Sequence, residues 1–332
     1  IADWSNQHPF IDFFKSARPW ITSTPTTWNT EEFEQLELDR HGWVMALPDD
    51  NPNANSGTQF TQVTTLVPNA VVFDRYLVLY DGEGTIKYGD ATIDVSVSSP
   101  GHDVIEARGD RSIILTIVET DPNQSGNYLR NIQVIPEPYV DIYQTQLFNP
   151  DFIEHLQGFQ VLRFTDWMKT NHSSQSDWDK RPSSRDAIYS TQGVPLEVMV
   201  KLANQTSIAP WFNMPHLATD DYMRNFAQYV NDHLDPALPV YVEFSNEVWN
   251  GQFVQARYAQ QKGNGDLAEV LLWFGQRTVD MTLIWEQVFR VDADRVIGVM
   301  GAQATNRWTA RQALLPIQTT GLEYSEVGSD AI

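Results

Sequence analysis

An amide and a carboxyl group stand side by side where a strand is expected to end. Residues 240–245 are predicted to form a buried strand, Asn246 and Glu247 follow it directly, and Trp249 and Asn250 come next. A carboxylic acid can protonate a departing oxygen, amides can bind hydroxyl groups, and an indole can stack on a sugar ring. This order predicts sugar chemistry centred on Glu247. The alternative is a strand end that carries an exposed acid and an isolated tryptophan.

Other expected strands also end in polar or aromatic side chains. Strands are predicted at 159–164, 208–214 and 295–300. Carboxyl ends of parallel strands meet at one edge of a sheet, so residues there can form a single site. The residues at or just after these ends are Arg163, Asp166, Trp167, His216 and Gln303.

Strands and helices alternate from about residue 148 onward. Helices are predicted at 196–204, at 220–234 with Thr219 as N-cap, and at about 267–290. Alternating units of this kind form a parallel sheet. The predicted fold class is therefore α/β, with a (β/α)8 barrel whose active face carries the polar strand ends.

The first part of the chain has a different pattern. Residues 8–18 are expected to form a short helix with Pro9 at its first position, followed by loops with short strands. Residues 60–136 show alternating short strands with Gly and Pro turns, including 76–80, 93–97 and 113–118, which predicts an inserted antiparallel β-sandwich. Three segments are thus expected: 1–59, 60–136 and 137–332.

Composition excludes several classes of protein. The chain has 332 residues, with Lys+Arg 22 against Asp+Glu 43 and a net charge of −21. This charge argues against nucleic acid and anionic membrane as partners, and no apolar run is long enough to span a membrane. With Cys 0, the chain has no disulfide or thiol nucleophile. We expect a monomeric, secreted or periplasmic protein that binds neutral ligands.

No cofactor or metal ion is expected. The 7 His are scattered, and the sequence contains no His-Glu-x-x-His spacing. Phosphate-binding loops and Gly-x-Gly-x-x-Gly motifs are also missing from the sequence. The acidic turn 81–84 is interpreted as a turn rather than a calcium loop.

The paired Asn246-Glu247 resembles the hallmark of the clan A glycoside hydrolases, a retaining (β/α)8 superfamily with many endo-glucanases and mannanases. Arg163, His216 and Glu243 match further positions of that pattern. The resemblance covers mainly residues 148–332, plus 1–6 as a possible end of strand one. It implies a retaining, endo-acting hydrolase of a β-linked polysaccharide of the glucan or mannan type.

The resemblance also implies roles for single residues. Glu247 would be the general acid and then the base, and Asn246 would bond the sugar 2-hydroxyl. Arg163 would orient carboxylates, or form a structural ion pair with Glu243. His216 would bond the sugar or the nucleophile, or serve as a structural histidine.

Several tryptophans are candidate sugar platforms, and core packing is the alternative for each of them. Asp166 and Gln303 are expected to bind hydroxyl groups. The loop 172–178 is expected to overhang the cleft. The candidate platforms are Trp4, Trp167, Trp178, Trp249 and Trp308.

A count of the remaining residues predicts an incomplete barrel. If Glu247 ends strand four, four further βα units need roughly 120 residues at about 30 each, and the 332 − 247 = 85 that follow are fewer. The resemblance implies a glutamate nucleophile at the end of strand seven. Glu323 and Glu326 are the late candidates but come early for that position, so the nucleophile is expected beyond residue 332.

Two other functions remain open at this point. A non-catalytic carbohydrate-binding protein would share the aromatic and polar strand ends without a working pair of carboxyl groups. A structural or adhesion protein would use the 60–136 segment and keep the α/β part as a scaffold. The same fold hosts many chemistries, so fold alone does not decide among them.

Overall fold

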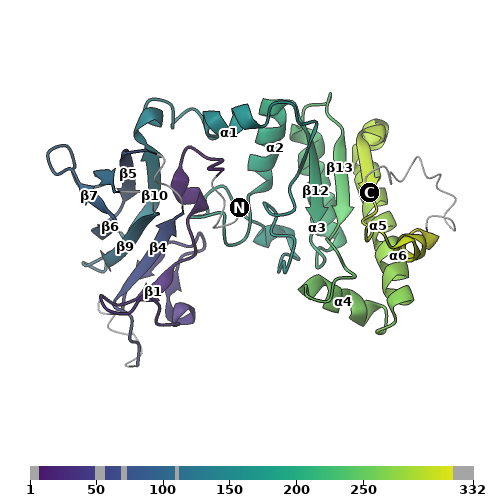
Figure 1. Cartoon of the computed structure of the whole chain (residues 1–332), viewed down its shortest axis with the longest axis horizontal. Helices are drawn as coiled ribbons and strands as arrows, with labels where there is room; N and C mark the ends of the chain where they lie inside the picture. The colour runs from purple at the N-terminus through teal and green to yellow at the C-terminus, as the bar shows by residue number, and fades with distance from the viewer. Residues whose placement is uncertain (1–6, 49–56, 69–72, 109–111, 317–332) are drawn as a thin grey trace. The chain divides into compact units, whose positions relative to one another are not determined.

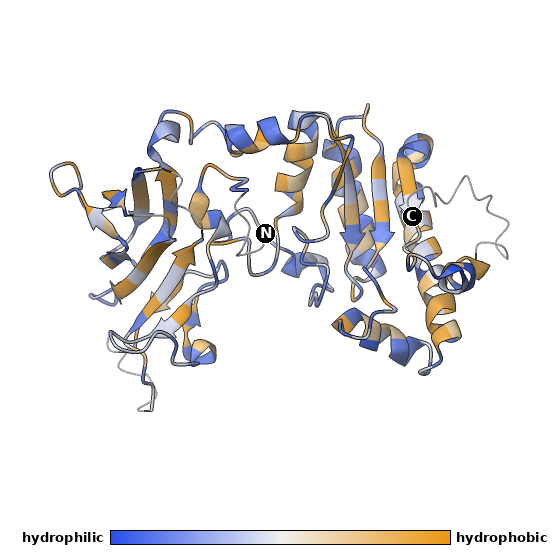
Figure 2. Ribbon diagram, in the orientation of Figure 1, coloured by the Kyte–Doolittle hydropathy of each residue, from blue (hydrophilic) through white to orange (hydrophobic). Residues whose placement is uncertain are grey.

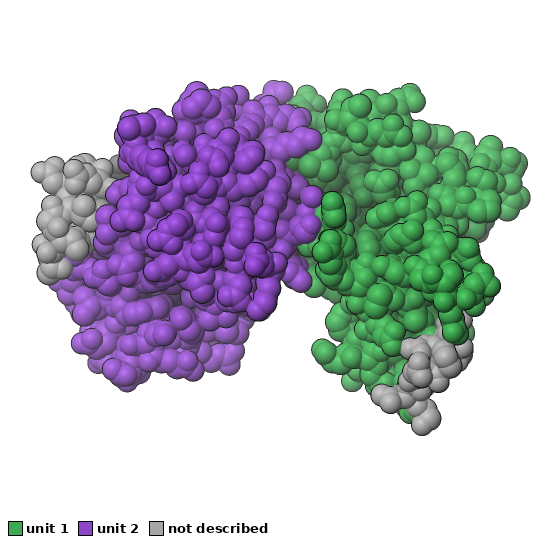
Figure 3. All heavy atoms as spheres, turned by 180° about the vertical axis from the view of Figure 1, so that it is seen from behind, with its two compact units in different colours: residues 1–156, 185–191 green, residues 157–184, 192–332 purple. Residues whose placement is uncertain are grey.

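The computed structural model describes residues 7–48, 57–68, 73–108 and 112–316. The chain divides into two compact units, residues 1–156 with 185–191 and residues 157–184 with 192–332 (Figure 3). Each unit is considered by itself below. These boundaries differ from the three segments expected from the sequence, since 1–59 and 60–136 belong to the same unit.

The first unit is built from two four-stranded antiparallel sheets (Figure 1). One has the order β1-β4-β9-β6, with strands Ile21–Ser23, Gln62–Val67, Ile113–Thr120 and Gly84–Gly89. The other has the order β10-β5-β8-β7, with strands Arg130–Pro136, Arg75–Asp81, His102–Ala107 and Ala91–Ile93. A small sheet pairs β2 (Glu37–Leu38) with β3 (Val44–Ala46).

One apolar core serves both large sheets of this unit. It includes Val63 from β4, Leu115 from β9, Val78 from β5 and Val134 from β10. The short helical elements are η1 (Phe13–Ser16), η2 (Phe33–Gln35), η3 (Glu137–Tyr139) and α1 (Pro150–His155). The returning segment 185–191 is tied to this unit by backbone bonds such as Tyr189 N to the Lys15 carbonyl at 2.8 Å.

Two local predictions in this unit were wrong. The expected helix at 8–18 is only the 3-10 turn Phe13–Ser16, because Asp12, not the region of Pro9, caps it by accepting from Phe14 N. The alternating run at 93–97 is a strand only to Ile93. Val95 is 83% exposed in the turn that follows, because backbone bonds back to Asp94 curl the chain there.

The second unit is built on a parallel sheet of order β11-β12-β13-β14. Its strands are Val161–Arg163, Ala209–Met214, Val240–Phe244 and Val296–Val299. The helices are α2 (Leu196–Thr206), α3 (Asp220–His233), α4 (Val254–Lys262), α5 (Leu267–Phe289) and α6 (Arg307–Ala313). Two 3-10 turns are η4 (Trp178–Lys180) and η5 (Arg290–Arg295). The predicted alternation of strand and helix is confirmed.

Local sequence explains these elements. Thr219 caps α3, since its hydroxyl accepts from Tyr222 N at 3.1 Å, as the sequence predicted. The central strands are buried because helices α2 and α5 pack on the sheet, and Phe226 of α3 packs edge-on against Phe212 of β12 (Figure 1). Trp285 of α5 has 0% exposure and stacks on Phe212 of β12. Figure 2 shows hydrophilic residues at the arrowheads of β12 and β13.

The coarse fold class is therefore α/β, with antiparallel sheets in one unit and a parallel sheet in the other. In the described ranges the parallel sheet has four strands in an open row, and it does not close into a barrel. The expected end of strand one at 1–6 lies outside the described residues. Within the described ranges, no helix combines the length and the apolar content needed to cross a bilayer.

Candidate functional site

Strand register brings polar residues of the parallel sheet together. Arg163 on β11 is opposite Trp211 on β12. Asn213, two residues further along β12, is opposite Glu243 on β13. Because side chains alternate between faces with a period of two, Trp211 and Asn213 project to the same face. Arg163, Trp211 and Asn213 all contact Glu243.

Glu243 is the centre of this cluster and is 4% exposed. Its Oε2 accepts hydrogen bonds from Arg163 Nε at 3.1 Å and from Arg163 Nη2 at 2.7 Å. The same oxygen accepts from Trp211 Nε1 at 3.0 Å and Asn213 Nδ2 at 2.8 Å. Burial raises the pKa of Glu243, and Arg163 and these donors oppose that rise. The structural ion pair foreseen between Arg163 and Glu243 is present.

The end of β14 also approaches this carboxylate. A methyl group on Gly301 would lie 3.1 Å from Glu243 Oε1 and 3.7 Å from Trp249 Cη2. Glycine is therefore the residue that lets the chain after β14 lie this close to both groups. Trp249, one of the predicted sugar platforms, is half-buried and packs edge-on against Phe274 of α5, with ring centroids 6.3 Å apart.

The backbone after β13 takes an uncommon path. Ser245 has a φ of +62° and Glu247 a φ of +44°, both in the left-handed region that non-glycine residues rarely adopt. Asn213 Nδ2 holds the first of these residues through the Ser245 carbonyl at 3.1 Å, and Ser245 N donates to the Met214 carbonyl at 2.8 Å. Such strain persists where surrounding contacts fix it, and it is common at functional sites.

Asn246 and Glu247 have different surroundings although they are adjacent. Asn246 Oδ1 accepts from Arg163 Nη2 at 3.1 Å, and Asn246 Nδ2 donates to Asn171 Oδ1 at 3.0 Å. Glu247 is half-buried, and its Oε2 accepts one bond, from Asn250 Nδ2 at 2.9 Å. Among the described residues this is the only hydrogen bond to the Glu247 carboxyl group, which leaves most of its lone pairs available to a ligand.

His216 is buried, with 3% exposure, and its ring packs against Tyr258 of α4 with centroids 5.3 Å apart. Within the described part of the chain, neither ring nitrogen has a hydrogen-bond partner. Burial lowers the pKa of His216 to about 4, with a smaller contribution from His172. The ring is therefore neutral at pH 7, with one nitrogen a donor and the other an acceptor.

The remaining predicted residues have surroundings of their own. Trp167 is half-buried against Phe164 at 5.5 Å, and Asp166 is exposed. Trp308 is 43% exposed on α6, and Gln303 Oε1 accepts from Asn306 Nδ2 at 3.0 Å. Over the described ranges, neither Trp308 nor Gln303 forms a hydrogen bond or ion pair with Glu243, Asn246 or Glu247. Trp4, Glu323 and Glu326 lie outside the described residues.

Four residues of the cluster were missed from sequence: Trp211, Asn213, Asn171 and Gln255. Asn213 had a signal, because it is a lone amide near the end of an apolar strand. Asn171 and Gln255 had none, since they come from a loop and from α4 and meet only in the folded chain: Gln255 Nε2 donates to Asn171 Oδ1 at 2.6 Å. The predicted cleft loop 172–178 contributes the His172 backbone N–H, which donates to Gln255 Oε1 at 3.1 Å.

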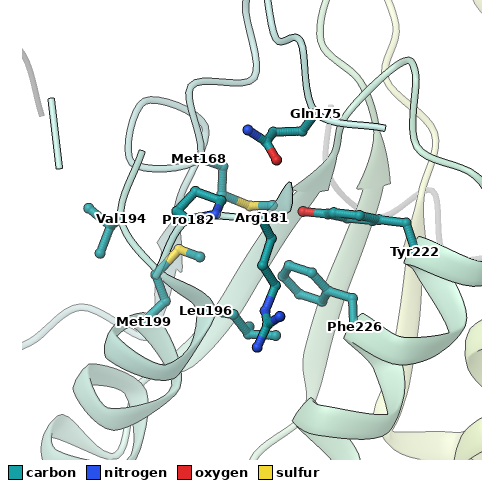
Figure 4. Close-up of a pocket in the computed structure, with 9 residues that line it drawn as sticks. All are labelled: Met168, Gln175, Arg181, Pro182, Val194, Leu196, Met199, Tyr222 and Phe226. Carbon is teal, nitrogen blue, oxygen red and sulfur yellow. The ribbon is translucent and has the colours of Figure 1, made fainter. Parts of the chain in front are cut away.

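A separate small cavity lies between α2, α3 and the preceding loops (Figure 4). Figure 4 shows Leu196 and Met199 of α2 on one side, and Tyr222 and Phe226 of α3 on the other. Its volume is about 20 Å³, the size of about one water molecule, so it has no room for a sugar ring. None of its lining residues is a predicted site residue.

Within the described residues, no group of three or more His, Asp or Glu side chains is placed to hold a metal ion. No family model, curated protein or solved structure matches the chain. What the cluster can do chemically therefore follows from its own groups. It offers a half-buried carboxyl group that accepts one hydrogen bond, the side-chain amides of Asn246 and Asn250, and the half-buried indole of Trp249.

Proposed function

We propose that this chain is a retaining, endo-acting glycoside hydrolase that cleaves a neutral β-linked polysaccharide of the glucan or mannan type. Glu247 is the general acid and then the base. Asn246 donates a hydrogen bond to a sugar hydroxyl, and Trp249 provides a face on which a sugar ring stacks. The proposal includes the finer fold expected from the sequence: a (β/α)8 barrel with an antiparallel β-sandwich inserted at 60–136.

One observation carries the proposal: two carboxyl groups within five residues have opposite surroundings. Glu243 is 4% exposed and accepts four hydrogen bonds on one oxygen, so its role is to hold Arg163, Trp211 and Asn213 in place. Glu247 is half-buried and accepts one. A general acid must reach the ligand with a carboxyl oxygen that is not already occupied, and Glu247 is the member of the pair with such an oxygen.

The proposed reaction begins with the transfer of a proton from Glu247 to the departing glycosidic oxygen. A retaining mechanism also needs a second carboxylate about 5–5.5 Å from the first, which attacks the sugar carbon and forms a glycosyl-enzyme. Water then attacks that intermediate while Glu247, now ionised, removes its proton. Over the described ranges, no contact identifies the second carboxylate, and Glu243 is unsuited because its charge is already matched by Arg163.

The test uses Glu247→Ala beside wild type on β-glucans, mannans and xylans. Loss of the general acid is expected to lower the rate on polysaccharide by roughly 10²–10⁴-fold. An aryl glycoside with a good leaving group needs less protonation, so its cleavage is expected to fall less, and added azide is expected to restore turnover as a glycosyl azide. Glu269→Ala, which truncates an exposed glutamate in the first turn of α5, is the matched control.

Wild-type cleavage that survives Glu247→Ala unchanged would refute the assignment of Glu247. Binding of glycans without cleavage by wild type would favour the non-catalytic carbohydrate-binding protein instead.

A further inference from the structure

A continuous row of hydrogen-bonded side chains includes Asn246, the residue before Glu247. It runs from Arg163 through Asn246 and Asn171 to Gln255, and it ends at the backbone N–H of His172. Gln255 has 0% exposure, and its Nε2 also donates to the Asn246 carbonyl at 2.9 Å. Three segments thus meet in this row: the loop after β11, the turn after β13, and α4.

The two ends of the row fix the orientation of every amide in it. A guanidinium can only donate, so Asn246 must turn Oδ1 to Arg163, and its Nδ2 then faces Asn171. A backbone N–H can only donate, so Gln255 must turn Oε1 to His172, and its Nε2 then faces Asn171. Asn171 Oδ1 accepts both bonds, at 3.0 Å from Asn246 and 2.6 Å from Gln255.

The orientation decides what the site presents to a ligand. An amide nitrogen carries two hydrogens, and among the described residues Asn246 Nδ2 uses one of them, on Asn171. If the amide turned over, the acceptor Oδ1 would take its place and the bond to Arg163 would be lost. The row therefore holds Asn246 as a donor, next in sequence to Glu247.

We propose that Asn171 and Gln255 are positioning residues that lock the Asn246 amide with Nδ2 as the donor, so that this corner of the site selects a ligand oxygen that accepts. A sugar hydroxyl oxygen is such a group. The identity of the ligand rests on the proposed function, whereas the locked amide does not.

The sharpest test compares two variants at one position. Asn171→Asp keeps an oxygen that accepts from both Asn246 and Gln255, whereas Asn171→Leu has a similar size and accepts nothing. On the polysaccharide that wild type cleaves, kcat/KM of Asn171→Leu is expected to lie at least about tenfold below that of Asn171→Asp, each measured at its own pH optimum, since one or two hydrogen bonds change. Asn225→Leu on α3, outside the row, is the control for removing an amide.

A second variant reverses one donor. Gln255→Glu can still accept from His172 N, but a carboxylate cannot donate to Asn171 or to the Asn246 carbonyl. It is expected to lower kcat/KM about as much as Asn171→Leu does. Urea unfolding of each variant reports whether the chain still folds. If Gln255→Glu does not fold, the comparison of Asn171→Asp with Asn171→Leu still tests the proposal.

A ligand-free measurement separates this inference from the proposed function. In protein labelled with ¹⁵N-asparagine, the Asn246 side-chain amide is assigned by its loss in Asn246→Asp. One of its protons is expected to exchange slowly in wild type and in Asn171→Asp, and quickly in Asn171→Leu. Fast exchange in wild type, or equal exchange in both Asn171 variants, would overturn the inference whether or not any glycan is cleaved. Absence of cleavage with the expected exchange pattern would remove the proposed function alone.

Discussion

Replacing Glu243 by glutamine tests whether the buried carboxylate organises the site. The amide has nearly the same shape, so Glu243→Gln removes the charge and leaves the packing in place. The ionised oxygen accepts four hydrogen bonds, two of them from Arg163. Hydrogen bonds to charged groups contribute about 1.5–3 kcal/mol each, against about 1 for neutral ones.

The expected loss of stability is smaller than the four hydrogen-bond contributions added together. Arg163 is 38% exposed at its side chain, so water solvates the guanidinium once its partner is neutral. We expect Glu243→Gln to lower the free energy of unfolding by roughly 2–3 kcal/mol.

Arg163→Met is the complementary change, and it leaves the carboxylate buried without its cation. We expect Arg163→Met to lower the free energy of unfolding by roughly 3–4 kcal/mol at neutral pH. The pKa of Glu243, already raised by burial, then rises further above its value in the unfolded chain. The folded state of this variant then binds a proton at Glu243 more tightly than the unfolded chain does. The stability that this proton binding contributes is present at low pH and is lost as pH rises through the folded pKa. The loss in Arg163→Met is therefore expected to be smaller at pH 5 than at pH 8.

The assay is urea unfolding followed by tryptophan fluorescence at both pH values. Because the chain has two compact units, each transition is fitted separately. Glu269→Gln, on the exposed side of α5, is expected to stay within about 0.5 kcal/mol of wild type. A Glu243→Gln protein as stable as this control, or an Arg163→Met loss that does not change with pH, would refute the reasoning.

Three further changes have defined outcomes. Gly301→Val places methyl groups against the Glu243 carboxylate, where the first carbon alone lies 3.1 Å from Oε1, and is expected to lower glycan cleavage more than 10-fold, measured as kcat/KM. His216, with its pKa lowered to about 4, keeps its neutral form in the folded state, so stability falls as pH falls from about 6.5 toward 4. His216→Phe is expected to remove up to roughly 3 kcal/mol of this fall in the free energy of unfolding, measured by urea unfolding across the pH range. An unchanged fall would contradict a buried, neutral His216. Burial raises the pKa of Asp12 to about 6. The contribution of its protonated carboxyl group to folding stability is therefore present below about pH 3.9 and is lost as pH rises through 6. Asp12→Asn is expected to flatten that decline in thermal melts of the first unit, whereas Asp12→Ala, which also loses the bonds to the backbone N–H groups of Phe14 and Val134, is expected to melt lower at every pH.

Prediction from sequence succeeded where the signal is local. The central strands of the second unit are apolar runs with polar ends, and α3 begins at Asp220, directly after Thr219, whose hydroxyl caps it. It failed where a local pattern competed with a tertiary contact. Val95 continued an alternating run, yet it lies in an exposed turn, and the region of Pro9 was expected to start a helix that Asp12 starts instead.

The candidate site divides in the same way. The pair Asn246-Glu247 and its place after a strand followed from residue types and hydrophobic periodicity, because both are written in consecutive residues. The carboxylate that faces Arg163 could be foreseen as an alternative role, and the structure contains that pair. The different burial of Glu243 and Glu247 could not be foreseen, since burial depends on which strands and loops surround each carboxyl group.

The sequence by itself determined the alternation of strands and helices in the second unit, the polar ends of its strands, and a chain without thiol chemistry. Only the tertiary structure decided that Asn213 and Glu243 share a register, that the turn after β13 is left-handed at Ser245, and that Asn171 and Gln255 orient Asn246. The physical reason is distance along the chain. Periodicity and capping act within a few residues, whereas the bond from Gln255 to Asn171 joins positions 84 residues apart, which only the folded backbone brings into contact.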